Sequence, residues 1–195
     1  MRYTTLAHES SHEISILNSR FIASGREVVS VSEAEAFLKQ IRAQWPDASH
    51  HCYAFRVAGP PVVDRFSDDG EPSGTAGKPI LTVLEHKVYN AIVVVTRYFG
   101  GTKLGTGGLV KAYTQATQAL LEAAGLIEKE PCQSLILHYP YHLSGSLAYQ
   151  LEQAGLSPKL DYAEAITCQI DVPVSEVDAL YERLSHPELK WEGLP

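Results

Sequence analysis

Residues 91–113, AIVVVTRYFGGTKLGTGGLVKAY, decide the fold, because they join an apolar strand to a glycine-rich segment and a helix. Ala91 to Thr96 is an unbroken and mostly β-branched run, which is typical of a strand buried on both faces. After the glycines at 100–108, apolar side chains recur at helical spacing from about Leu109 to Ala124, and Gly125 follows. The stretch therefore predicts a central strand followed by a helix with an inward apolar side.

The residues before this stretch predict four strands, two helices and a long loop. Ser32 and Glu35 have the spacing of a capping box, so we expect a helix that starts at Ser32 and ends at Pro46. The other expected elements are strands at 3–7, 13–17 (continuing at 20–23), 51–57 and 62–66, a loop at 67–78 and a short helix at 79–85.

Beyond Pro131 the pattern restarts. It predicts strands at 133–139, 159–162, 165–172 and 189–191, with helices at 143–153 and, capped by Ser175, at 176–184. This β-α-β-β-α-β order is typical of a ferredoxin-like domain. We therefore expect an α+β chain of two domains, residues 1–130 and 131–195.

Composition indicates an intracellular globular protein. Hydrophobic residues make up 45% of the 195 and charged residues 20%, and no apolar run approaches the roughly 18–20 residues that span a bilayer. The first eleven residues lack the pattern of a signal peptide. Cys52, Cys132 and Cys168 lie far apart in strand-like runs, which favours small buried hydrophobes over a catalytic thiol or a disulfide framework. We expect a cytoplasmic protein that does not bind membranes.

Charge is distributed unevenly along the chain. The net charge of −7 divides into −1 for residues 1–47, +2 for 48–115 and −8 for 116–195, where 4 basic side chains face 12 acidic ones. Polyanions should be repelled by the chain as a whole and by its last third most of all. DNA is therefore not expected as a partner, and any contact with a nucleic acid is restricted to a local site in the middle segment.

The glycine-rich segment predicts an anion site. Eight of the 14 glycines lie between Gly70 and Gly108. We expect Gly105-Thr106-Gly107-Gly108 to precede the helix, so that free N–H groups and the positive helix end point outward. Lys103 and Lys111 flank this segment, and Arg97 ends the buried strand. The alternative is a tight strand-to-helix connection with its lysines in solvent. Neither the P-loop pattern nor the dinucleotide-binding pattern fits these residues.

Asp68, Asp69 and Glu71 place three carboxylates within four residues. Such a group can hold a hard cation or act as a general acid or base. The same residue types are also ordinary turn chemistry, and a salt bridge from this loop to Arg97 or Lys78 would be structural. The adjacent histidines at 50 and 51 point to opposite faces of a strand and have no third ligand at a metal-binding spacing. We expect neither a metal nor a cofactor, and no catalytic residue is assigned.

Five motifs in residues 14–125 are similar to those of the bacterial YigZ branch of the IMPACT family. They are His50–Ala54, Phe66–Pro72, Gly74–Pro79, Val95–Gly101 and Leu104–Tyr113. The resemblance implies an N-terminal domain like the second domain of a small-subunit ribosomal protein, followed by a ferredoxin-like domain. Eukaryotic members of the family regulate translation through protein partners, whereas no established reaction comes with the bacterial branch. Because small-molecule kinases share the N-terminal topology, this likeness does not choose a function.

Three functions remain open. The first is a non-enzymatic regulator that binds the ribosome, RNA or a translation-associated protein through a glycine-rich basic surface. The residues assigned to this surface are Arg97, Tyr98, Lys103, Thr106, Gly107, Gly108, Lys111 and Lys78, with Tyr98, Phe99 and Tyr113 as stacking aromatics. The second is an enzyme for a small phosphorylated or carboxylated substrate, with Asp68, Asp69 or Glu71 supplying the chemistry. The third is a partner-binding module whose glycines only shape the fold.

Overall fold

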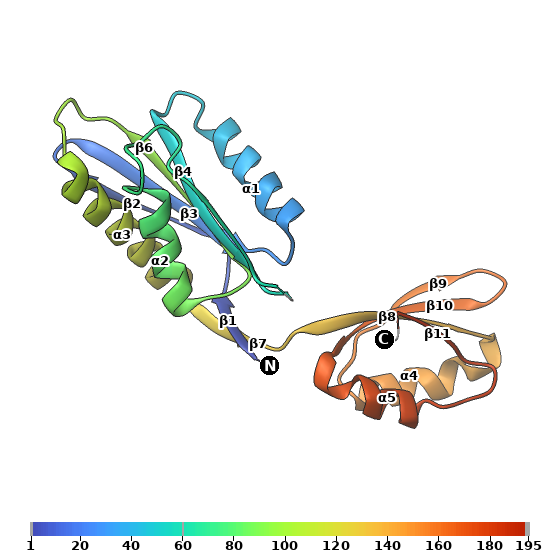
Figure 1. Ribbon diagram of the computed structural model, residues 1–195. Coiled ribbons are helices and arrows are strands. Elements are labelled where there is room, and N and C mark those ends of the chain that lie inside the picture. Colours follow the sequence, from blue (N-terminus) through green and yellow to red (C-terminus); the bar gives the residue numbers. More distant parts are fainter. Residues whose placement is uncertain (1, 60, 194–195) are drawn as a thin grey trace. The chain divides into compact units, whose positions relative to one another are not determined.

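The computed structural model describes residues 2–59 and 61–193. This part of the chain forms an α+β fold with five α-helices and three antiparallel sheets (Figure 1). The chain divides into two compact units, of which the first holds Tyr3–Lys129 and the second holds the residues from Glu130 onward together with Arg2. Within the described ranges, no helix is both long and apolar enough to cross a membrane.

The first unit is built on a five-stranded sheet with the order β2-β3-β6-β4-β5. One helix covers one face of this sheet, and two helices cover the other (Figure 1). The central strand is buried over seven of its eight residues, as its unbroken apolar run predicts. The elements are β2 (Ser10–Ile16), β3 (Ser19–Glu27), α1 (Val31–Gln44), β4 (His50–Val57), β5 (Val63–Ser67), α2 (Gly77–Lys87), β6 (Ala91–Tyr98) and α3 (Gly105–Ala124).

Alternation along β6 divides its side chains between two cores. Val93 and Val95 pack with α2 and α3, whereas Ile92 and Val94 pack with α1. Because successive side chains of a strand point to opposite faces, Arg97 lies on the side of α2 and α3, and its neighbour Tyr98 lies on the side of α1. This division decides which predicted site residues can meet.

Helix α1 begins two residues earlier than we expected. Its N-cap is Ser30, whose hydroxyl accepts a hydrogen bond from the Glu33 N–H at 3.2 Å. The Glu33 carboxylate accepts in turn from the N–H of Val29 at 3.0 Å. The predicted cap at Ser32 with Glu35 is therefore wrong, because an identical Ser-x-x-Glu spacing precedes it by two residues.

Helix α3 begins at Gly105, four residues before the expected start. Gly107 and Gly108 thus form part of its first turn and are not in a preceding loop. Helix α2 likewise starts at Gly77, so the loop before it is shorter than predicted. Apolar periodicity marks a helix only from its first apolar residue, and glycines in a first turn carry no such signal. The end of α3 was predicted correctly at Gly125, whose φ is +66°.

A strand that we did not predict closes the first unit. β7 (Leu126–Lys129) pairs antiparallel with β1 (Tyr3–Leu6), so that Tyr3 lies opposite Lys129. Four residues are too few to show a period-2 pattern, and the partner strand is distant in the sequence.

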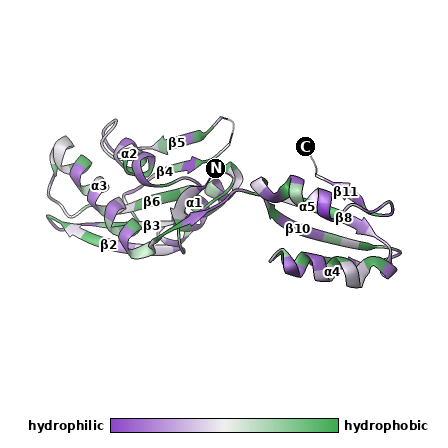
Figure 2. Ribbon diagram, turned by 90° about the horizontal axis from the view of Figure 1, so that it is seen from below, coloured by the Kyte–Doolittle hydropathy of each residue, from purple (hydrophilic) through white to green (hydrophobic). Residues whose placement is uncertain are grey.

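The second unit has a four-stranded antiparallel sheet with the order β11-β8-β10-β9. Its core lies between this sheet and two helices, and hydrophobic and hydrophilic residues alternate along its elements (Figure 2). We expected Ser175 to cap the second helix, and this is wrong. Its hydroxyl donates to Glu130 instead. The elements are β8 (Cys132–Tyr139), α4 (Ser144–Gln153), β9 (Lys159–Tyr162), β10 (Ile166–Pro173), α5 (Val177–Arg183) and β11 (Lys190–Glu192), with 3₁₀ turns at Tyr141–Leu143 and Val174–Glu176.

Candidate functional site

A pocket of about 340 Å³ lies in the first unit where β6 ends and α3 begins. Five of the residues predicted for a site line it: Glu71, Arg97, Phe99, Lys103 and Thr106. The remaining lining residues are Pro72, Leu104, Gly105 and Leu109. The acidic loop before α2 and the glycine-rich segment after β6 therefore meet at one place, although they are far apart in the sequence.

Glu71 and Arg97 form a buried ion pair in this pocket. The Arg97 Nη1 donates to the Glu71 Oε1 at 2.5 Å, and the two side chains are 6% and 4% exposed. Arg97 also donates through Nη2 to the hydroxyl of Ser19 at 3.4 Å. Its guanidinium lies over the rings of Phe21 and Phe99, at 5.3 and 5.5 Å from their centroids. Among the described residues, the buried Nε of Arg97 has no hydrogen-bond partner.

Tyr113 holds the carboxylate from the side of α3. Its hydroxyl donates to the Glu71 Oε1 at 2.8 Å, and burial raises the pKa of Tyr113 far above its usual range, so the hydroxyl stays protonated. The Cys52 thiol donates to the Tyr113 hydroxyl at 3.3 Å, and burial raises the pKa of Cys52 to about 12. Because Tyr113 is fully buried, the expectation that it offers a ring for stacking is wrong.

The other two carboxylates of the acidic loop bind the protein's own backbone. Asp68 accepts hydrogen bonds from the N–H groups of Gly74, Ala76 and Gly77 at 2.8–3.0 Å. Asp69 accepts from the N–H of residue 51 at 2.7 Å and pairs with an arginine of α1 at 3.0 Å. These contacts are the turn chemistry that the sequence left open as one alternative. In the described ranges, no group of three potential metal ligands occurs.

The rim of the pocket has the groups that bind an anion. The N–H groups in the first turn of α3 lack the intrahelical partners that later residues have, as in any helix. No side chain caps them in their place. Lys103 and Thr106 are exposed beside this turn. A Cβ added to Gly107 would meet nothing within 4 Å, and its φ lies outside the range that favours glycine. Neither packing nor backbone geometry therefore requires a glycine at 107.

Phe99 is held at the rim of the same pocket. Phe99 is 49% exposed, and the guanidinium of Arg97 lies over its ring. Its N–H donates to the hydroxyl of Ser49 at 3.2 Å. The following residue is Gly100, whose added Cβ would lie 2.1 Å from the carbonyl carbon of Asn18, so glycine is required there. The outer part of the Phe99 ring is thereby offered to a ligand.

Of the residues predicted for the basic surface, Gly107 lies in the first turn of α3 without lining the pocket, and four others lie elsewhere. Tyr98 lies on the opposite face of the sheet, 6.4 Å from the ring of Trp45. Lys78 pairs with a glutamate of α2 at 3.4 Å, Gly108 packs against the residue before α3, and Lys111 is exposed farther along α3. The alternation of side chains along β6 could have shown that Tyr98 and Arg97 lie on opposite faces of the sheet. Nothing in the sequence pointed to Ser19 or to the apolar wall at Leu104.

Three cysteines were expected to be buried. Cys52 and Cys168 are buried, and burial raises the pKa of both thiols, so neither has the character of a nucleophile. Cys132 is exposed, which contradicts the expectation. It is the first residue of β8 and shares the outward-facing parity of Ser134, whereas Leu135 faces the core.

The fold and the pocket define an α+β protein with a pocket beside a buried ion pair. The Impact N-terminal domain family matches residues 17–121, which include every pocket residue. IMPACT family member YvyE of Bacillus subtilis is 35% identical over 182 residues, which cover 92% of this chain and 84% of that protein. IMPACT family member YigZ of Escherichia coli is 39% identical over 175 residues, covering 87% and 85%. The chain belongs to the IMPACT family, as its motifs indicated.

A solved structure extends this likeness to the whole chain. It is titled as the crystal structure of a hypothetical protein, is 34% identical in sequence and has a TM-score of 0.71. The alignment covers 100% of this chain and 98% of that one. Both units therefore occur together in a solved relative.

Proposed function

We propose that this protein is a non-enzymatic regulator that binds single-stranded RNA of the translation machinery, the ribosome above all, at the pocket between β6 and α3. The observation that carries this proposal is the meeting of Lys103, the uncapped first turn of α3 and the ring of Phe99 in one pocket. A phosphate and a base are the two groups that such a set of side chains recognises together.

The phosphate is bound by the N-terminus of α3. Backbone N–H groups and the positive end of the helix attract an anion, and Lys103 adds a full charge beside them. Thr106 supplies a hydroxyl, and the bare backbone of Gly107 lets a ligand approach closely. This arrangement requires no base sequence.

The base stacks on Phe99. Stacking of a base on an aromatic side chain contributes about 1–3 kcal/mol, and the guanidinium of Arg97 holds the ring from its other side. Tyr98 and Tyr113, which we also considered for stacking, are directed elsewhere. A single nucleotide is therefore the unit that the pocket takes.

The charges in and around the pocket limit the contact with RNA. The charge of Arg97 is balanced by Glu71, and that of Lys78 by a glutamate of its own helix. Few cations remain for phosphates, and a net charge of −7 opposes an extended contact. We expect one or two phosphates to be neutralised, with log K falling by roughly 0.7 per phosphate for each unit of log salt.

Finer assignments of fold and location accompany this proposal. The β-α-β-β-α-β order and the strand order β11-β8-β10-β9 support a ferredoxin-like domain over residues 131–195. The likeness of residues 1–130 to a ribosomal-protein domain rests on the family motifs. A ribosomal partner implies a cytoplasmic location.

An enzyme for a small phosphorylated or carboxylated substrate is the second candidate. The observation that favours it is a pocket volume in the range of small-molecule sites, with the carboxylate of Glu71 in its wall. Arg97 and Tyr113 both donate to that carboxylate, which makes it a poor general base. Stabilisation of the fold by small phosphate compounds in a thermal-shift screen, without any binding of RNA, would favour this candidate.

Co-sedimentation with purified ribosomes at low and high salt tests the proposal. Lys103→Glu is the informative variant, because a substitution of Arg97 would break the buried ion pair and disturb the fold. Lys39→Glu is the matched control, since Lys39 is exposed on α1 at the opposite face of the sheet. We expect the native chain and the control to pellet at low salt and Lys103→Glu to remain in solution. Absence of native pelleting at low salt would refute ribosome binding.

Binding to a fluorescently labelled RNA shows whether the ribosomal partner is RNA or protein. The native chain should shift a short single-stranded RNA oligonucleotide in fluorescence anisotropy, and Phe99→Ala should weaken the binding by about tenfold or more, which is the loss of one stacked base. Ribosome pelleting without any binding of single-stranded RNA would show that the partner is a protein.

A further inference from the structure

The negative charge of the chain is concentrated in the second unit. Residues 130–193 have 3 basic and 10 acidic side chains, a net charge of −7, which equals that of the whole chain. This unit lies outside the pocket described above, and it repels RNA. A surface of this charge attracts a positively charged partner instead.

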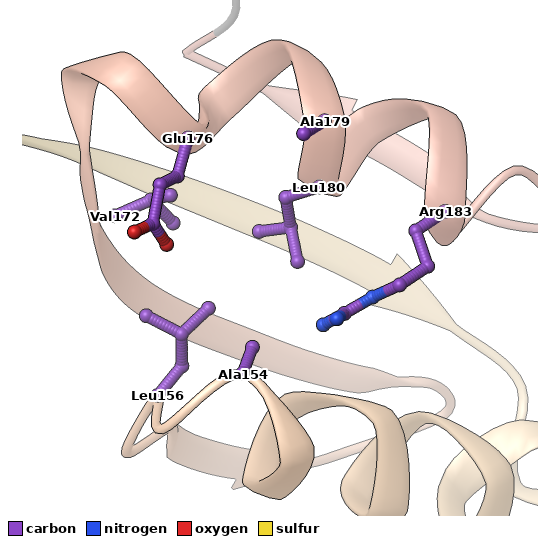
Figure 3. A pocket seen from close by; sticks show the side chains of 7 residues that line it. All are labelled: Ala154, Leu156, Val172, Glu176, Ala179, Leu180 and Arg183. Carbon is purple, nitrogen blue, oxygen red and sulfur yellow. The ribbon is translucent and has the colours of Figure 1, made fainter.

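A hollow of about 230 Å³ lies in this unit between α5 and the turn that follows α4 (Figure 3). Its walls are apolar and include Leu156, Val172 and Leu180. Figure 3 shows the carboxylate of Glu176 at one end of the hollow and the guanidinium of Arg183 at the other.

The two charges at the ends of the hollow are not equivalent. Arg183 donates through Nη2 to the backbone carbonyl of Gln150 at 2.8 Å, so its charge is used to join α5 to α4. In the part of the chain that the structure describes, the Glu176 side chain has neither a hydrogen-bond nor an ion-pair partner. Two helical turns separate the two residues, a distance of roughly 10 Å along the axis. The uncommitted charge of the hollow is therefore negative.

A second hollow of about 380 Å³ adjoins the first and shares Leu156 with it. It is lined by the end of α4 and the following loop, with Pro158 as a further apolar residue. Its acidic residue is Glu152, whose carboxylate also lacks a partner within the described ranges. Each hollow thus combines an apolar wall with one free carboxylate.

We propose that these two hollows form a docking groove for an extended, lysine-rich segment of a protein partner. A lysine side chain has a long aliphatic stem and a cationic end, which match an apolar wall and a carboxylate. One stem lies against Leu180 with its ammonium group at Glu176, and the next lies against Leu156 with its ammonium group at Glu152. A second copy of this chain is a poor occupant, because two copies of this acidic unit repel each other.

Peptide binding to the full chain tests this groove. The probe is a fluorescent, terminally capped nonapeptide with three lysines that alternate with serines, and its binding is measured by anisotropy. The comparison peptide has 2,4-diaminobutyrate in place of lysine, which keeps the ammonium groups and shortens each stem by two methylenes. We expect the lysine peptide to bind at least threefold more tightly, because its longer stems bury more apolar surface. Equal affinities of the two peptides, or no binding of the lysine peptide, would overturn the proposal.

Paired charge variants locate the site. Glu152→Gln/Glu176→Gln should weaken the lysine peptide roughly three- to tenfold, the loss expected for two exposed ion pairs. Asp161→Asn/Glu164→Gln removes the same charge from the β9–β10 hairpin and should change the affinity less than twofold. Equal weakening by both pairs would show attraction by net charge alone and would refute the groove. Dimers of the native chain that only the first pair abolishes would make a second copy the occupant, which also refutes it.

Discussion

The guanidinium of Arg97 and the carboxylate of Glu71 lie 2.5 Å apart beneath the pocket, and both are shielded from solvent. Arg97 belongs to the end of β6, and Glu71 to the loop before α2, 26 residues earlier in the chain. Their contact attaches this loop to the centre of the sheet. Since a charge buried without its partner is strongly unfavourable, the position of the loop depends on both residues.

Arg97→Met should lower the free energy of unfolding by roughly 3–5 kcal/mol, because it leaves Glu71 buried without its cation. The double variant Glu71→Gln/Arg97→Met should lose less than Arg97→Met alone, since it removes the orphaned charge as well. Urea unfolding of the two variants and the native chain measures this difference. A double variant less stable than the single one would show that the pair is not coupled in this way.

Ser30→Ala should destabilise the fold by about 1 kcal/mol, because the hydroxyl of Ser30 caps α1. Ser32→Ala is the matched control: it removes the exposed contact of 3.0 Å between the two serine hydroxyls but keeps the bond from Glu33 to Ser30, so we expect it to cost less than about 0.5 kcal/mol. Denaturant midpoints of both variants decide between the two caps. A larger loss for Ser32→Ala would restore the start of the helix at residue 32.

Elements that are set by residues close together in the sequence were predicted correctly. The burial of β6 followed from its apolar run, and the end of α3 followed from Gly125. The start of α1 could not be chosen, because Ser30 and Ser32 each have a glutamate three residues later. Tertiary contacts decide between two such equal signals.

The sequence predicted which segments form the site better than it predicted which of their side chains meet. Glycines and charges marked the segments that meet at the pocket, and a salt bridge from the acidic loop to either Arg97 or Lys78 was considered. Only the sheet register shows that Arg97 faces Glu71, while Tyr98 faces away. Ser19 reaches Arg97 across 78 residues of sequence, and no local pattern carries information about such a contact.

Cys132 should react rapidly with a thiol reagent in the native state, whereas Cys52 and Cys168 should be protected. Burial shields both protected thiols and raises their pKa values, to about 12 in the case of Cys52, so little thiolate forms. Titration with a chromogenic disulfide reagent at pH 8 should therefore show one fast thiol, and three after denaturation. Cys132→Ser should abolish the fast phase; a fast phase that persists would mean that a buried thiol becomes accessible.

Acidification should destabilise the protein through His51. Its ring donates from Nε2 to the backbone carbonyl of Trp45 at 3.0 Å, and burial lowers the pKa of His51 from its ordinary value of 6.5. Well above pH 6.5 the ring is neutral in both states, so His51 causes no loss of stability there. As the pH falls below 6.5, the unfolded chain binds the proton first, and the free energy of unfolding decreases until the native ring is also protonated.

Urea unfolding at pH 7.5 and 5.5 measures this loss. His51→Gln should make it smaller, because glutamine does not titrate, whereas the same substitution at the exposed His12 should leave it unchanged. An equal loss in the native chain and in His51→Gln would assign the acid sensitivity to other groups.

Gly107→Ala should separate stability from binding. An added Cβ at this position meets no atom within 4 Å, and alanine is a better helix former than glycine by up to about 1 kcal/mol. The variant should therefore unfold at the same or a higher urea concentration. If an RNA phosphate lies against the backbone of Gly107, the new methyl group occupies the space of the ligand, and pelleting with ribosomes should decrease.

Gly100→Ala is the contrasting variant. Its Cβ would lie 2.1 Å from a backbone carbon of Asn18, so the fold must shift, and a loss of binding there would follow from a loss of structure. Of the two glycine variants, only Gly107→Ala can weaken binding in a protein that is as stable as the native chain. Unchanged pelleting of this stable variant would mean that no ligand approaches the first turn of α3, and the phosphate site would have to be abandoned.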